Sequence, residues 1–296
     1  MERVSMLSLI SRTYQKFGED KAPAFAAALA FFTIFSIAPI LIIVIGIVSL
    51  ALGASAAQGQ LVNQLQGMVG PQAAQSIQQA IQNTNTGGGG VWATVVGFAA
   101  LLIAATGLVV QLKDVLNTIW GIKPAPKGGI GAILLALWSR LVSLLLILFV
   151  GILLLIFFSA SSVLHSAGHY LSRLGVVADV LIRIGYYVFF IALITLLFGM
   201  LYKYLPDVRI RWKNVWVGAA GTALLFVLGN FLISLYLGRV GVGSTFGASG
   251  SLVLILLWIF YSAQIFLFGA EFTRVYTRSQ GERIEPAGNA MKISSE

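Results

Sequence analysis

The sequence predicts an all-α, polytopic integral membrane protein with six transmembrane helices and both termini in the cytoplasm. Three observations support this fold class. Of the 296 residues, 58% are hydrophobic and 10% are charged, whereas a soluble domain is about a quarter charged. Long uncharged runs recur along the chain, and the run from Leu252 to Gly269 is long enough to cross a bilayer. Finally, Lys and Arg are unevenly divided between the predicted loops.

Residues 1–21 are expected to form a cytoplasmic amphipathic helix. Leu7, Ile10, Tyr14 and Phe17 recur at three- and four-residue spacing with charges between them. We expect this helix to lie on the membrane surface as an anchor rather than to act as a regulator. A transmembrane domain is predicted to follow over residues 22–275.

The first predicted span covers about Ala24 to Leu52 and contains Pro39 near its middle. A proline at this position removes one backbone hydrogen bond and is expected to kink the helix. The kink could serve packing, which is the simpler explanation, or it could mark a substrate path or a hinge. Residues 54–86 are rich in Gln, Asn, Ala and Ser, and we expect them to form an uncharged helical hairpin outside the cytoplasm.

The second predicted span, 91–112, continues into an amphipathic segment. Asp114 and Thr118 fall on one face of that segment, and Val115 and Ile119 fall on another. Trp120, which follows, is expected to anchor the chain at the membrane interface.

The third span is expected to begin at Ser139, with residues 130–137 lying on or dipping into the inner surface. A span that began at Ile130 would place Arg140 about 15 Å deep. The alternative is a buried functional arginine. An outer loop is predicted over residues 164–179.

The later spans are expected at about 180–202, at about 215–237 and in the run that begins at Leu252. Residues 276–296 are polar and are predicted to form a disordered cytoplasmic tail.

The distribution of basic residues sets the predicted topology. With the N-terminus inside, 16 of the 19 Lys and Arg residues fall on the inner side, and only Arg173, Arg183 and Arg239 remain outside. This asymmetry accounts for the net charge of +9 without a nucleic-acid partner.

Several stretches resemble one known family. They are AAALAFFTIFSIAPILI around Pro39, QLKDVLNTIWGI, and the pair YLPDVRIRWKNVWVGA and STFGASGSLVLILLWIFYSAQIFLFGAEFTRV. In these stretches the chain resembles the YihY/BrkB family of bacterial inner-membrane proteins, formerly labelled ribonuclease BN. The resemblance implies a multi-pass protein of the bacterial inner (cytoplasmic) membrane with six transmembrane helices. The resemblance does not identify an active site in this chain.

The acidic residues argue against an enzyme. Those outside the termini are scattered, namely Asp114, Asp179, Asp207 and Glu271. A metal-dependent nuclease needs several carboxylates or histidines that converge on one point. His165 and His169 are four residues apart but have no Glu between them, so we expect a solvated loop there rather than a metal site. We therefore expect no catalytic residues, no metal and no cofactor, and we disfavour the ribonuclease label.

Polar residues in or near the spans are the candidate functional residues. Such groups are costly in lipid and therefore rare there, so their presence suggests a function. We predict a charged cluster at the cytoplasmic mouth of a cavity between helices, or alternatively a salt-bridge network that only fixes topology. The cluster would contain Asp114, Asn117, Arg140, Glu271 and Arg274. The predicted helix kink and cavity lining would contain Pro39, Asn230, Tyr236, Tyr261 and Gln264.

An apolar lining suits an amphipathic molecule, and a basic inner rim would attract anionic lipid head groups by about 1 kcal/mol per Lys or Arg. The sequence therefore predicts a transporter or flippase-like protein for a lipid or another amphipathic envelope molecule, with membrane lipids as partners. The alternative is a non-transporting scaffold or envelope-integrity factor that acts through the hairpin 54–86. Gly218, Gly221 and Gly229 could pack within one chain or between the chains of a homodimer.

Overall fold

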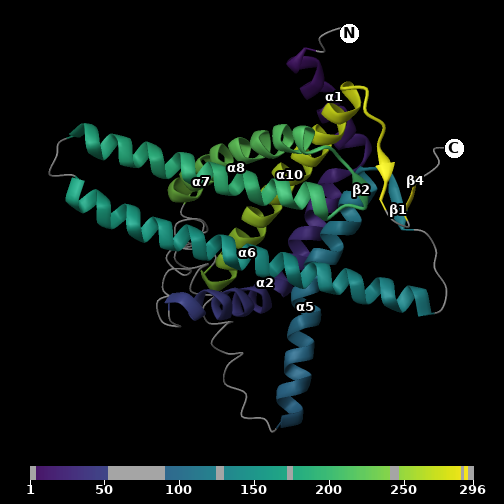
Figure 1. Cartoon of the computed structure of the whole chain (residues 1–296), viewed down its shortest axis with the longest axis horizontal. Helices are drawn as coiled ribbons and strands as arrows, with labels where there is room; N and C mark the ends of the chain where they lie inside the picture. The colour runs from purple at the N-terminus through teal and green to yellow at the C-terminus, as the bar shows by residue number, and fades with distance from the viewer. Residues whose placement is uncertain are drawn as a thin grey trace.

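A computed structural model describes residues 5–52, 91–124, 130–171, 176–240, 247–287 and 290–292 (Figure 1). Its helices are α1 (Met6–Glu19), α2 (Ala22–Leu52), α5 (Val91–Ile119), α6 (Ile130–Leu171), α7 (Val176–Tyr204), α8 (Trp212–Val240) and α10 (Gly247–Ser279). Its strands are β1 (Ile122–Pro124), β2 (Val208–Arg209), β3 (Glu285–Pro286) and β4 (Ala290–Lys292). The predicted all-α membrane fold is confirmed.

Among the residues that the structure describes, four helices are long and apolar enough to cross a membrane, over Arg140–Phe157, Ile184–Tyr204, Trp212–Ile233 and Val253–Ser279. A fifth candidate is the bent pair α1 and α2, whose axes differ by 66°. The count of six spans therefore stays a prediction. The predicted hairpin 54–86 lies outside the described residues.

The helix α6 is a single helix of 42 residues, or about 63 Å at 1.5 Å per residue. It is about twice as long as the hydrocarbon core of a bilayer is thick. The apolar stretch Arg140–Phe157 of this helix is long enough to cross a bilayer, and the predicted start of the span at Ser139 stays a prediction. The residues before Arg140 continue the same helix.

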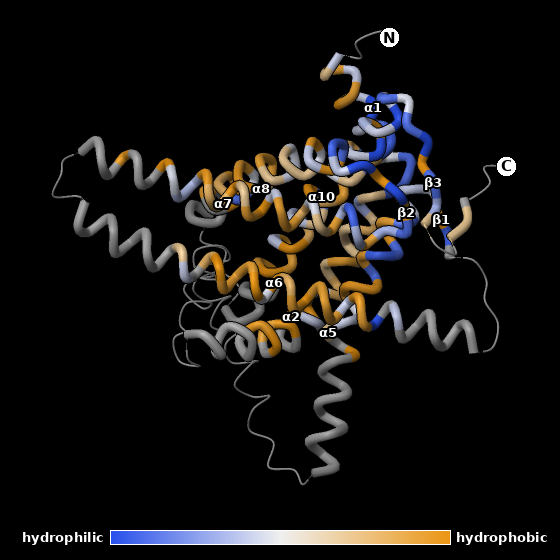
Figure 2. Tube along the Cα trace, in the orientation of Figure 1, coloured by the Kyte–Doolittle hydropathy of each residue, from blue (hydrophilic) through white to orange (hydrophobic). Residues whose placement is uncertain are grey.

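The helices converge at one polar end. Figure 2 shows hydrophilic residues gathered around α1, the strands and the C-terminal part of α10, whereas the described bodies of the long helices are largely hydrophobic. In the packed arrangement, α2 contacts α5, α6 and α10, and α8 contacts α7 and α10. One side of α6 is left exposed by its neighbours, as lipid-facing helices require. That side carries Leu141, Leu145, Leu148, Ile152 and Ile156.

Small residues bring α8 and α10 into close contact. A methyl group added at Gly218 would overlap the side chain of Thr273, and one added at Gly269 would overlap Thr222. The buried Tyr202 of α7 joins this contact, because its hydroxyl donates a 2.7 Å hydrogen bond to the carbonyl oxygen of Phe266 on α10. Without a hydrophobic force between helices in lipid, such backbone approach is the main source of association.

The glycines of α8 do not all serve this contact. Gly218 meets α10 through Thr273, and Gly229 meets it through Tyr261, so both pack within one chain. A methyl group at Gly221 would come within 4 Å of no atom among the described residues.

The C-terminal segment differs from the predicted disordered tail. Residues 276–279 complete α10, β3 pairs antiparallel with β2, and β4 pairs antiparallel with β1. Residue Ile284 is buried, and the backbone N–H of Ala287 donates to the carbonyl oxygen of Asp207 at 2.8 Å. Composition favoured disorder, but the exposed backbone of the connecting loops supplies pairing partners.

Two further predictions need correction. The outer loop predicted over 164–179 is mostly helical, since α6 continues to Leu171 and α7 begins at Val176. A single glycine, Gly168, costs only about 1 kcal/mol in a helix and does not end α6. Trp120 is not an interfacial anchor, because it is 2% exposed and belongs to the main core.

Replacement of Gly218 by Ala should destabilise the folded protein by about 1–3 kcal/mol, because the added methyl group overlaps Thr273. Thermal unfolding of the purified protein in detergent measures the loss. Gly221→Ala is the matched control on the same helix, and it should be neutral or slightly stabilising. Equal destabilisation by both variants would contradict the proposed close contact.

Candidate functional site

The residues predicted for one cytoplasmic cluster form separate groups in the structure. Glu271 and Arg274 lie together on α10, Asn117 contacts the loop between α7 and α8, and Arg140 contacts α5. Asp114 is exposed and joins none of these hydrogen-bonded groups. The predicted cluster is therefore divided among several contacts between elements.

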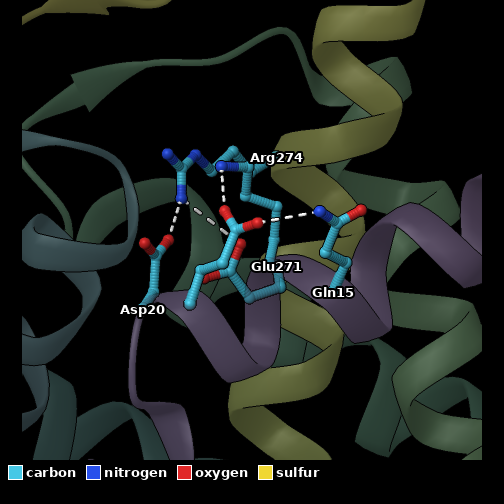
Figure 3. A network of polar contacts seen from close by, with 6 residues as sticks. Gln15, Asp20, Glu271 and Arg274 are labelled. Carbon is cyan, nitrogen blue, oxygen red and sulfur yellow. Dashed lines mark hydrogen bonds and ion pairs between the residues drawn. The ribbon is translucent and has the colours of Figure 1, made fainter.

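The first group joins α10 to the corner between α1 and α2 (Figure 3). Arg274 Nη1 forms ion pairs with Asp20 Oδ2 and, at 3.4 Å, with Glu271 Oε2. Glu271 is completely buried, and its Oε1 accepts no hydrogen bond from any described residue. We call Asp20, Glu271 and Arg274 the corner triad.

Local structure explains how the corner triad forms. Asp20 caps the C-terminal end of α1, with its N–H donating to the carbonyl oxygen of Lys16 at 2.9 Å. Lys21 then takes a left-handed backbone conformation with φ of 53°, which turns the chain into α2. Glu271 and Arg274 are three residues apart, so they share one face of α10.

The neighbouring residues of α1 make their own contacts, as Figure 3 shows. Gln15 Nε2 donates to Glu19 Oε1 at 2.9 Å, and Lys16 pairs with the other oxygen of Glu19. These bonds to Lys16 and Gln15 lower the pKa of the Glu19 carboxyl. The negative charge of Glu19 is thus balanced by Lys16 within α1, and Arg274 remains available to Asp20 and Glu271.

The second group joins α5 to the loop between α7 and α8. Asn117 Nδ2 donates to Asp207 Oδ2 at 3.0 Å, and the backbone N–H of Asp207 donates to Asn117 Oδ1 at 2.7 Å. Lys113 Nζ lies 2.9 Å from Asp207 Oδ1. Both polar ends of the Asn117 amide are therefore satisfied, and the pair fixes this loop against α5.

Asp114 lies beside this group in the sequence but is not part of it. Partial desolvation raises the pKa of the Asp114 carboxyl, the neighbouring Lys113 opposes the rise, and Asp207 adds to it. Its side chain is exposed, so we expect it to face water or lipid head groups.

Arg140 forms the third group. Its Nη1 donates to the carbonyl oxygen of Ile103 at 3.2 Å and to the hydroxyl of Thr106, both on α5. Arg140 therefore connects α6 to α5, and it is an exposed rather than a buried arginine.

The residues predicted for the kink and cavity lining lie on α2, α8 and α10. Trp258 Nε1 donates to Asn230 Oδ1 at 3.0 Å, which links α10 to α8. Tyr261 packs against Gly229, and Gln264 is half-buried on α10. α2 continues as one helix through Pro39, but the side chains of Pro39 and Tyr236 lie outside the described residues, as do those of His165 and His169.

Sequence reasoning missed the partners that complete these groups. Asp20 and Asp207 each stand in a short connection and carry no pattern of their own. Glu282 was placed in the predicted tail, yet its carboxylate accepts from Asn214 Nδ2 at 2.8 Å and pairs with Arg211 at 3.2 Å. The only sequence signal that could have identified such partners is their position, in a helix corner or a turn directly beside the end of a predicted span.

No group of three or more metal-ligating side chains occurs among the residues that the structure describes. The ion pairs and amide bonds found there connect separate elements at the polar end. Chemically, these groups can bind a proton or a charged head group.

Comparison with known proteins places residues 13–294 under the family model described as Virulence factor BrkB. Relatives named UPF0761 membrane protein include one from Pseudomonas aeruginosa, 28% identical over 86% of this chain, and one from Verminephrobacter eiseniae, 28% identical over 88%. Another, from Alcanivorax borkumensis, is 25% identical over 88%. The matches cover 59%, 60% and 58% of those proteins, so the chain spans about three-fifths of their length. No solved structure matches.

A double-mutant cycle should test the division into groups. Asn117→Ala and Asp207→Ala should show a coupling energy of about 0.5–3 kcal/mol, because the two residues share hydrogen bonds. Asn117→Ala and Arg274→Gln should be additive, because the two residues share no partner in the part of the chain that the structure describes. Unfolding free energies in detergent provide the measurement. Strong coupling between Asn117 and Arg274 would instead restore the single predicted cluster.

Proposed function

The chain belongs to the Virulence factor BrkB family of membrane proteins, and on this premise we propose that it is a transporter or flippase-like protein for a lipid or another amphipathic envelope molecule. We propose the bacterial inner membrane as its location. The printed names of its relatives state no activity. The proposal therefore draws its support from the surface of the molecule, and it assigns no catalytic step to the chain.

The observation that carries the proposal is a cationic rim at the polar end of an apolar helix bundle. The rim consists of exposed Lys and Arg side chains on α1, α8, α10 and the connections between helices, in the region where Figure 2 shows hydrophilic residues gathered. Its members are Arg12, Lys21, Lys123, Arg209, Arg211, Lys213, Arg278 and Arg283. Anionic head groups are attracted to such a rim by about 1 kcal/mol per basic residue.

Aromatic side chains lie directly beside the rim. Trp212 stacks on Trp216 with ring centroids 5.5 Å apart, and Tyr204 meets Trp212 edge-on at 5.9 Å. Lys203 Nζ lies 5.9 Å from the Trp212 ring, which is a cation–π distance. Trp and Tyr favour the membrane–water interface, which supports the proposal that lipid head groups meet the protein at this depth.

A molecule with an anionic head and an apolar body matches the cationic rim and the apolar helix surface next to it. Its head would bind the rim, and its body would lie along helices that expose leucine, isoleucine and phenylalanine. An ion or a sugar would gain nothing from the apolar part. We therefore propose membrane lipids as the partners, and the rim gives no reason to invoke nucleic acid.

The polar residues inside the candidate spans support passage rather than simple anchoring. Trp258 Nε1 donates to Asn230 Oδ1 between α8 and α10, and Tyr261 packs at the same interface. Polar side chains that turn toward neighbouring helices are the expected lining of a path through a membrane protein. We propose that Asn230, Tyr261 and Gln264 contact the moving molecule.

Native mass spectrometry of gently extracted protein should reveal an anionic amphipathic molecule bound in fixed ratio. The double variant Arg209→Gln with Lys213→Gln should weaken its retention by about tenfold to thirtyfold, since two basic residues are lost. The charge-conserving variant Arg209→Lys with Lys213→Arg is the matched control. Reconstitution in vesicles that contain a fluorescent phosphatidylglycerol then measures its movement between leaflets. Equal retention in both variants, or no movement, would contradict the proposal.

Deletion of Ser55 to Thr84 separates the proposal from the scaffold alternative. A transporter should keep much of its lipid binding without this segment, because the segment contributes no residue to the cationic rim. A scaffold that acts through the segment should lose its cellular activity while lipid binding is unchanged. Cellular resistance and lipid retention are measured on the same variant.

A further inference from the structure

We propose that Asp20 and Glu271 form a buried proton-binding site, in which the two carboxyls hold one proton beside Arg274. The site lies where α10 meets the corner between α1 and α2 (Figure 3).

Charge balance in the corner triad favours a bound proton. Arg274 Nη1 is the partner of both Asp20 and Glu271, so a single guanidinium faces two carboxyls. The Glu271 side chain is 0% exposed. An uncompensated carboxylate at such a position loses its hydration, and a proton removes that cost.

Other charged groups nearby do not supply the missing compensation. Lys16 pairs with Glu19, and Lys113 pairs with Asp207. The helix α2, which packs on α10, contains no ionisable side chain. The remaining ionisable groups on α1, the corner after it, α5, the N-terminal end of α8 and the C-terminal end of α10 are all exposed except the half-buried Tyr276. They are Arg12, Tyr14, Lys21, Asp114, Lys213, Tyr276 and Arg278.

Arg278 is the cation most able to compete with a proton. It lies one turn beyond Arg274 on α10 and interacts electrostatically with Glu271 and Asp20. Its side chain is exposed, so water screens this interaction. Arg278 therefore does not replace the proton at the buried carboxyl.

The second observation is the free oxygen of Glu271. While Oε2 faces Arg274, the buried Oε1 accepts no hydrogen bond from any described residue. Asp20 Oδ2 and Glu271 Oε2 both contact the same nitrogen, Arg274 Nη1, so the two carboxyls meet at one point and can share one proton. The proton thus satisfies an oxygen that otherwise has no partner among those residues.

Exposure along the triad defines a route for the proton. The Asp20 side chain is 25% exposed, that of Arg274 is 10% exposed and that of Glu271 is 0% exposed. A proton can therefore reach Asp20 from water at the polar end and pass to Glu271. Release would leave both carboxylates in competition for Arg274, which alters the ion pair that holds the α1–α2 corner to α10.

This site gives the proposed transporter a means of using a proton gradient. The coupling role rests on the proposed function, whereas proton binding itself does not require transport. The two can therefore be tested apart, with proton binding measured on the full-length purified protein.

Infrared difference spectroscopy during a pH titration tests the site. The wild-type protein should show the carbonyl stretching band of a protonated, buried carboxyl that disappears at high pH. The variant Glu271→Gln should lose this band, and the matched control Glu285→Gln, which alters an exposed carboxyl, should keep it. Size-exclusion chromatography and thermal unfolding confirm that each variant is folded.

The variant Asp20→Asn provides an independent test that leaves Glu271 in place. It removes one negative charge, so Arg274 alone compensates Glu271 and ionisation becomes easier. The midpoint of the band should fall by about 1–3 pH units. A band that persists unchanged in Glu271→Gln, or a midpoint that does not fall in Asp20→Asn, would overturn the proton site. Proton binding with no lipid movement would instead overturn only the transport proposal.

Discussion

The ion pairs of Arg274 with Asp20 and Glu271 hold the polar end of the structure together. They fasten the corner between α1 and α2 to α10, which itself packs against α1, α2, α5 and α8. A charged group buried with too few partners is costly, so the surrounding helices must keep this geometry or release the charge. The 66° bend between α1 and α2 lies at the same contact, because Asp20 stands in the short connection between the two helices.

The apolar part of the bundle obeys a different constraint. In lipid, helices gain little from burying leucine and gain more from close backbone approach. Gly218 and Gly269 permit that approach between α8 and α10, and Tyr202 adds a buried hydrogen bond from α7. The polar end is thus stabilised by ion pairs and strand pairing, whereas the apolar part is stabilised by close packing of complementary helix surfaces.

The candidate site was predicted in part. Intramembrane and near-membrane polar residues are rare enough to be found by inspection, which is why Asn117, Arg140, Glu271 and Arg274 were selected. Their grouping was not predictable, because Asp20 and Asp207 belong to connections far away in sequence. The prediction joined the residues by their common depth, but the structure separates them by the helix pairs to which they belong.

The sequence by itself determined the membrane class and the long helices, because hydropathy is a property of composition along the chain. Only the tertiary structure decided which helices touch, that Trp120 is buried, and that the C-terminal segment pairs with β1 and β2. These features depend on contacts between residues far apart in sequence, and no local pattern encodes the partner of a strand or of a buried carboxyl.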